Sequence, residues 1–166
     1  KQQLIPAMNK VYFTFKAYVE ESGTDIEHLL QELLSYAKWY RILLKGNTTD
    51  TELNSCIYRL NRLETTITRP FFLEVLRLQA NNKILLSDVK EIFLYTENYL
   101  FRRSICDLPT NALNKIFLML HREIVRYDGT EDNYVKKFKY ALRAKSDRGR
   151  FPDDNEFIEA FTVRSV

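Results

Sequence analysis

The side chains best suited to bind a ligand or a partner lie close together between Tyr99 and Phe117. An arginine pair, Arg102 and Arg103, is followed by three small polar residues: Thr110, Asn111 and Asn114. A planar guanidinium binds phosphate and carboxylate oxygens equally well, so this segment permits either a phosphate contact or an ion pair between neighbouring parts of a protein. Pro109 interrupts the helical pattern here. The segment therefore predicts two helices joined at a corner that the polar residues organise.

Arg103 is expected to face the protein interior. It extends the apolar stripe of the preceding helix, which runs through Val89, Ile92, Phe93, Thr96 and Leu100. Arg102 lies about 100° further round the same helix, where it can meet solvent, another domain or a phosphate. A buried guanidinium needs a partner, because an unpaired buried charge is very costly. The candidate partners are Glu97, Asp107 and the amide oxygens of Asn111 and Asn114. We expect Arg103 to lock the Pro109 corner.

Positive charge is concentrated between residues 136 and 150. The whole chain has a net charge of +3, whereas this segment holds seven basic residues and one acidic residue, Asp147. The basic residues are Lys136, Lys137, Lys139, Arg143, Lys145, Arg148 and Arg150. Such asymmetry indicates a contact with DNA phosphates or with an acidic protein domain. It is also the composition of an ordinary solvated helix end, since the helix dipole favours cations near a C-terminus.

The chain offers no catalytic constellation. Its two histidines, His28 and His121, have no acidic or cysteine partner at metal-ligand spacing. No glycine-rich phosphate loop, nucleophile elbow or zinc-protease motif occurs. The acidic residues at 153, 154 and 156 fit a helix N-terminus better than a metal site. We therefore expect no enzyme activity, no cofactor and no metal in this chain.

The composition is typical of one globular domain. A chain of 166 residues can bury a sizeable core, and 45% hydrophobic residues exclude a disordered protein. No apolar run reaches the length of about 18 residues that a membrane helix needs. Cys56 and Cys106 lie in apolar helical contexts, as buried free thiols do in a reducing compartment. We expect one domain over residues 1–166, without a membrane partner, in the cytoplasm.

Helical periodicity runs through nearly the whole chain, interrupted by glycine, proline and asparagine. The expected helix starts are near residues 3, 24, 49–51, 70, 87, 110, 130 and 153. Four starts carry an expected capping residue: Thr24, Ser87, Thr110 and Asp153. The second helix bears an apolar stripe from Ile26 to Leu44. No alternating strand pattern competes, so the sequence predicts an all-α fold, an irregular single-domain bundle of about eight helices.

Four segments, taken in order, resemble one protein family. They are the aromatic-rich opening helices at 11–44, the short helix after proline at 68–78, the R-R-S-I-C and T-N-A-L-N-K-I-F motifs between 102 and 117, and R-F-P-D-D-N-E-F at 150–157. Each motif alone is weak, but the ordered set is similar to GmrSD-type restriction proteins, the type IV enzymes that cut modified foreign DNA in bacterial defence. The resemblance covers nearly the whole chain.

The resemblance implies that this chain is the helical middle of a longer protein. In that family an N-terminal ParB/sulfiredoxin-like nucleotidase domain carries a D-G-Q-Q-R motif, and a C-terminal HNH nuclease carries a histidine-centred metal motif. Neither motif occurs here, so no catalytic role transfers to a residue of this chain. The implied function is a non-catalytic interdomain module. Its partners are the two flanking domains and double-stranded DNA, and the parent uses a nucleoside triphosphate and a divalent metal. The alternative is a pure protein-interaction scaffold with no nucleic-acid contact.

Overall fold

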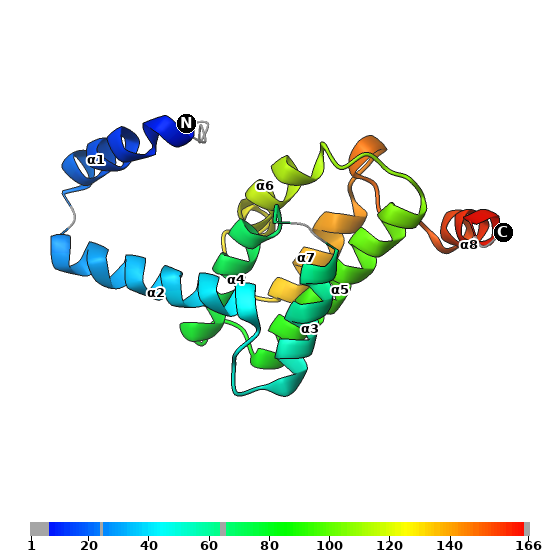
Figure 1. The fold of residues 1–166 in the computed structure, drawn as a ribbon, viewed down its shortest axis with the longest axis horizontal. Coiled ribbons are helices and arrows are strands. Elements are labelled where there is room, and N and C mark those ends of the chain that lie inside the picture. Colours follow the sequence, from blue (N-terminus) through cyan, green and yellow to red (C-terminus); the bar gives the residue numbers. More distant parts are fainter. Residues whose placement is uncertain (1–6, 24, 64–65, 165–166) are drawn as a thin grey trace. The chain divides into compact units, whose positions relative to one another are not determined.

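The structure is a computed structural model that describes residues 7–23, 25–63 and 66–164, and all regular structure within these ranges is helical (Figure 1). The short 3₁₀ helices are η1 (Met8–Lys10) and η2 (Asp147–Gly149). The α-helices are α1 (Val11–Ser22), α2 (Ile26–Lys45), α3 (Thr51–Arg62), α4 (Arg69–Ala80), α5 (Leu86–Ile105), α6 (Leu113–Arg126), α7 (Tyr134–Arg143) and α8 (Asp154–Arg164). The predicted all-α fold with about eight helices is confirmed.

The chain divides into two compact units, Lys1–Ala37 and Lys38–Val166. The first unit holds η1, α1 and the beginning of α2. Its apolar side chains are largely exposed, among them Tyr12 and Phe13 on α1 and Leu30 on α2, whereas Leu29 of α2 is buried. This division does not test the prediction of one domain over residues 1–166, which stays a prediction.

The hydrophobic core lies in the second unit and is built around aromatic rings. Phe72 of α4 stacks on Phe93 of α5 with ring centroids 3.9 Å apart. Phe71 stacks on Phe138 of α7 at 5.5 Å and also meets Phe117 of α6. All five rings are almost completely buried, and each contributes roughly 1.5–3 kcal/mol through burial. Helix α4 therefore ties α5, α6 and α7 into one body.

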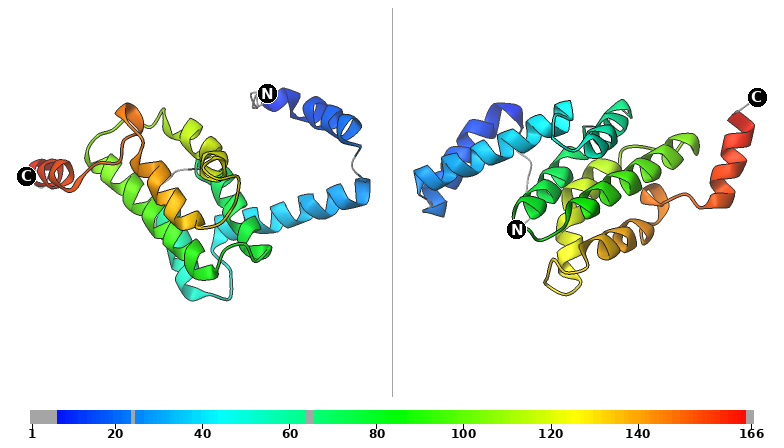
Figure 2. Two further views of the ribbon diagram at one scale, coloured as in Figure 1. Left: turned by 180° about the vertical axis from the view of Figure 1, so that it is seen from behind. Right: turned by 90° about the horizontal axis from the view of Figure 1, so that it is seen from below.

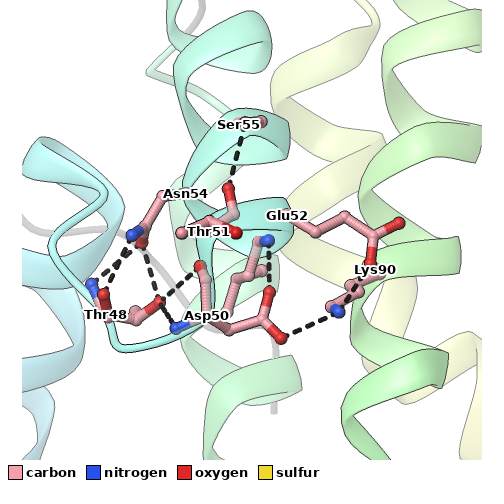
Figure 3. Close-up of polar contacts among 8 residues, drawn as sticks. Thr48, Asp50, Thr51, Glu52, Asn54, Ser55 and Lys90 are labelled. Atoms are coloured by element: carbon pink, nitrogen blue, oxygen red, sulfur yellow. Dashed lines mark hydrogen bonds and ion pairs between the residues drawn. The ribbon is translucent and has the colours of Figure 1, made fainter.

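The turn from α2 to α3 is closed by a polar network that also reaches α5 (Figure 3). Asp50 caps α3, its Oδ1 accepting from the Leu53 amide at 2.7 Å. Its other carboxylate oxygen lies 2.8 Å from Lys90 Nζ on α5. Thr48 and Asn54 hydrogen-bond to each other through side chains and main chain. This turn sets the position of α3 along α5.

Two of the four expected caps, Ser87 and Thr110, differ from the structure. Helix α5 begins after Leu85, so Ser87 lies within its first turn and is not its cap, and the Leu85 amide donates to the Asp88 carboxylate at 2.8 Å. Helix α6 begins at Leu113, later than the cap predicted at Thr110, and its N-cap Ala112 makes no side-chain capping bond. Thr24 lies outside the described residues. The cap predicted at Asp153 is confirmed by a 2.9 Å bond from the Glu156 amide.

Helix α8 lies at the far end of α5, beyond the other helices of the second unit (Figure 2). It packs on α5 through two ring contacts: Phe157 meets Phe101 at 6.0 Å and the guanidinium of Arg102 at 4.9 Å. Other apolar side chains of α8, Ile158 and Phe161 among them, are exposed. A small apolar contact alone would hold this helix weakly, so polar contacts from α5 carry much of its placement.

Candidate functional site

The centre of the candidate site is the guanidinium of Arg103, near the C-terminal end of α5. Arg103 is 2% exposed and donates to three main-chain carbonyls. These belong to Pro109 at 2.7 Å, Arg148 at 2.8 Å and Arg150 at 3.0 Å. Bonds from a cation to carbonyl oxygens are stronger than neutral ones. Arg103 thus joins three chain segments: α5, the Pro109 corner and the stretch before α8.

Arg103 is buried, as its inward position predicts, and its guanidinium binds the Pro109 carbonyl. That this contact locks the corner stays a prediction. The predicted partners are wrong. Instead of Glu97, Asp107, Asn111 or Asn114, the guanidinium takes the three carbonyls. Glu97 binds Arg59 of α3 at 3.0 Å. The Nε of Arg103 is buried and has no hydrogen-bond partner within the described part of the chain.

Tyr99, one turn before Arg103 on α5, also binds the segment before α8. Its hydroxyl donates to the Gly149 carbonyl at 2.7 Å, and its ring lies 5.3 Å from the Arg103 guanidinium. Burial raises the pKa of Tyr99, against the opposing influence of Arg103, so the phenol remains a donor. The carbonyls of residues 148, 149 and 150 are therefore each held by α5.

Arg102 holds the beginning of α8. Its Nη2 lies 2.6 Å from Asp154 Oδ1, and its Nη1 donates to the Pro152 carbonyl at 3.3 Å. Arg150 forms an ion pair with Glu156 in the first turn of the same helix. We call Tyr99, Arg102 and Arg103, with the carbonyls and Asp154 that they bind, the α8 root. Tyr99 was not predicted to belong to this site, and Asp154 was predicted only to lie at a helix N-terminus. The spacing of Tyr99 and Arg103, one turn apart on an inward stripe, was the only signal for the former.

The other members of the central motif lie outside this network. Thr110, Asn111 and Asn114 are all exposed. The corner reaches Arg103 through the Pro109 carbonyl instead. Any role for these three side chains is therefore at the surface, near the start of α6.

Four of the seven basic residues between 136 and 150 pair with carboxylates. The pairs are Lys137 with Asp128, Lys139 with Glu91, Lys145 with Glu123, and Arg150 with Glu156. Arg143 donates to the Tyr95 hydroxyl at 2.7 Å. Lys136 and Arg148 are exposed and have no carboxylate partner among the described residues. The positive charge of this segment is thus largely compensated by acids that other parts of the chain supply.

The histidines are placed as structural or surface residues. His28 is exposed, and His121 Nδ1 lies 3.0 Å from the Tyr134 hydroxyl. Burial lowers the pKa of His121. Within the described ranges no group of three or more His, Cys, Asp or Glu residues could hold a metal ion. No helix there has both the length and the apolar character to cross a membrane.

No family model, curated protein or solved structure matches this chain.

Proposed function

We propose that this chain is a non-catalytic helical module that holds α8 in a set position. Through α8 it positions the nucleotidase and HNH nuclease domains that flank it in a GmrSD-type, modification-dependent restriction protein. One observation carries the proposal: the adjacent residues Arg102 and Arg103 both bind the segment that leads into α8.

The two arginines divide this task between them. Arg103 is buried and binds main-chain carbonyls, so the stretch around Arg148 and Arg150 must stay in place for the charge to be satisfied. Arg102 is partly exposed and binds the carboxylate of Asp154 within the first turn of α8. There an acid is also favoured by the helix dipole. A helix held in this way transmits the position of one domain to whatever follows it.

The resemblance supports the same conclusion. Two of the four segments that carry it, around 102–117 and 150–157, contact each other directly through the α8 root. Two motifs that lie nearly 50 residues apart and meet in one hydrogen-bond network share one structural role, which is to position α8. In this proposal the nucleoside triphosphate, the divalent metal and DNA cleavage belong to the parent protein.

A protein-interaction scaffold without nucleic-acid contact is the second candidate. It is favoured by the ion pairs that compensate most of the basic residues between 136 and 150. A DNA-binding face needs cations that are free to neutralise phosphates. In this version the basic residues fix α7 within the module.

The positioning role is tested by amide hydrogen exchange on the chain carrying Arg102→Ala. We expect amides of α8 to exchange about five- to tenfold faster, because the helix loses its ion pair and its carbonyl contact, while the core helices keep their protection. Arg122→Ala, an exposed arginine of α6, is the matched control. Unchanged exchange in α8 would contradict the role.

The restriction assignment has its own test. The gene that encodes this chain should carry a D-G-Q-Q-R motif upstream and an HNH histidine motif downstream, in the same or the adjacent reading frame. In the complete protein, Arg102→Ala should lower cleavage of modified DNA without lowering the melting temperature of this module. A gene that lacks both motifs refutes the assignment and leaves the scaffold candidate.

A further inference from the structure

Helix α2 carries a second apolar face, distinct from the side that holds its buried residues Leu29 and Leu43. On this face six residues recur at alternating spacings of four and three. They are Ile26, Leu30, Leu33, Ala37, Tyr40 and Leu44, and we call them the α2 seam. All six are exposed, five of them by 40–65%. The seam runs along nearly the full length of one uninterrupted helix (Figure 1).

The spacing of the seam is typical of a helix that pairs with another helix. Alternating steps of four and three keep apolar residues on one narrow stripe, which a coiled coil buries against the stripe of its partner. Single exposed apolar residues are common on protein surfaces, whereas a continuous apolar stripe marks an interaction surface. Tyr40 has one contact within the chain, since its hydroxyl accepts a hydrogen bond from Arg69 at 3.1 Å, yet the residue is 40% exposed. No other helix in the described ranges packs along the seam.

One edge of the seam carries an opposite charge at each end. Glu27 and Arg41 lie two heptads apart on this edge, and Leu34 lies midway between them. All three are exposed. Neither charge has an ion-pair partner within the described part of the chain. The order of the edge is therefore acid, leucine, base, and such an edge is complementary to itself when it is reversed.

A twofold axis across the middle of the seam reverses the edge in this way. In an antiparallel pair of α2 helices, Glu27 of each copy lies opposite Arg41 of the other, and the two Leu34 side chains meet near the axis. Every contact across a twofold axis occurs twice, so one sequence supplies both ion pairs. A parallel pair would instead place Tyr36 across from Arg41. Charge complementarity thus selects a second copy of this chain, in the antiparallel direction.

We infer that this chain forms a twofold homodimer in which α2 of one copy packs antiparallel on α2 of the other through the α2 seam. Leu33 of one copy then packs beside Ala37 of the other in the middle of the interface. The seam spans fewer than three heptads, so we expect a dissociation constant on the order of micromolar. The inference does not rest on the proposed function, because a positioning module acts equally well as a monomer or a dimer.

The test is sedimentation velocity of the chain at about 1–200 µM and about 50 mM salt. We expect a reversible change from monomer to dimer as the concentration rises. Leu33→Glu should abolish the dimer, since it places a charge in the middle of the apolar stripe of both copies. Leu94→Glu on α5 is the matched control, because Leu94 is 45% exposed and Leu33 is 44% exposed. The control should leave the monomer–dimer equilibrium unchanged.

Charge reversal tests the direction of the pairing. Arg41→Glu should weaken the dimer about tenfold, because it turns two attractive pairs into two repulsive ones. Adding Glu27→Arg to the same chain should restore the affinity to within about threefold, since both pairs form again with their signs exchanged. Melting temperatures at the lowest concentration check that the monomers stay folded. If Leu33→Glu lowers that temperature, the two charge variants decide, since both positions are exposed.

The inference is overturned if the chain stays a monomer over the whole concentration range. This is the result expected if α1 or a different protein covers the seam. Equal effects of Leu33→Glu and Leu94→Glu would also overturn it, because the dimer would then not depend on the seam. So would an unchanged affinity for Arg41→Glu, or a failure of Glu27→Arg to restore the affinity.

Discussion

Tyr99 and Arg103, one turn apart on α5, hold three consecutive main-chain carbonyls, those of residues 148, 149 and 150. The tyrosine takes the middle carbonyl and the arginine takes the two on either side. Each side chain also faces the other, with the guanidinium 5.3 Å from the ring. The stretch before α8 is therefore held through its backbone carbonyls.

Removing Arg103 should destabilise the fold severely. In Arg103→Ala the carbonyls of Pro109, Arg148 and Arg150 lose their donor and a cavity opens in a buried site. We expect the free energy of unfolding to fall by about 3–5 kcal/mol. Urea denaturation followed by circular dichroism measures this loss. Arg103→Lys should recover part of the loss, since an ammonium reaches fewer of the carbonyls. A loss below about 1 kcal/mol would show that the three bonds add little.

A milder change isolates the tyrosine contact. Tyr99→Phe keeps the buried ring but leaves the Gly149 carbonyl without its donor. We expect a loss of about 1–2 kcal/mol in the free energy of unfolding. The matched control is Tyr140→Phe, where the ring is 60% exposed and the stability should stay unchanged. Equal stabilities for the two variants would count against a structural role for the Tyr99 hydroxyl.

The ion pairs of α7 and its flanks limit how strongly this chain can bind DNA. Three of the seven basic residues between 136 and 150, namely Lys136, Arg143 and Arg148, lack a carboxylate partner in the described structure. Each phosphate contact contributes a slope near −0.9 in log K against log salt. We therefore expect a slope no steeper than about −2.7 in fluorescence anisotropy titrations with duplex DNA.

Two charge reversals separate the alternatives for DNA binding. Lys136→Glu combined with Arg148→Glu should remove most of whatever binding occurs. Lys139→Glu is the contrasting variant, since Lys139 pairs with Glu91, and it should change stability more than DNA affinity. A slope steeper than −2.7 by several units would mean that the ion pairs break when DNA binds. The module would then belong to a DNA clamp.

Stability should also depend on pH through Asp128. Its hydrogen bond with Lys137, followed by that with the Thr130 amide, lowers the pKa of Asp128 from 3.8 to about 2. A carboxyl whose pKa is lower in the folded state stabilises the fold above its unfolded pKa. That contribution should disappear as the pH falls from about 4 through 2. Asp128→Asn should flatten this part of the stability curve. Thermal denaturation between pH 1.5 and 6 provides the measurement.

The sequence by itself determined the fold class and the register of α5. Apolar residues at helical spacing specify helices locally, so the all-α fold follows from periodicity alone. The same periodicity put Arg103 on the inward stripe after Leu100, and burial confirms it. The cap at Asp153 could also be predicted from the sequence, because a cap and the amide that it binds lie within one turn of each other.

Only the tertiary structure decided what these residues bind. Arg103 takes backbone carbonyls up to 47 residues away, and every residue carries a carbonyl, so no residue type signals such a partner. The compensation of the basic segment could not be predicted for a related reason. Its partners Glu91 and Glu123 lie on other helices, α5 and α6. Helical spacing describes one element at a time. Partners supplied by other elements depend on how the helices pack, and packing is a property of the whole core.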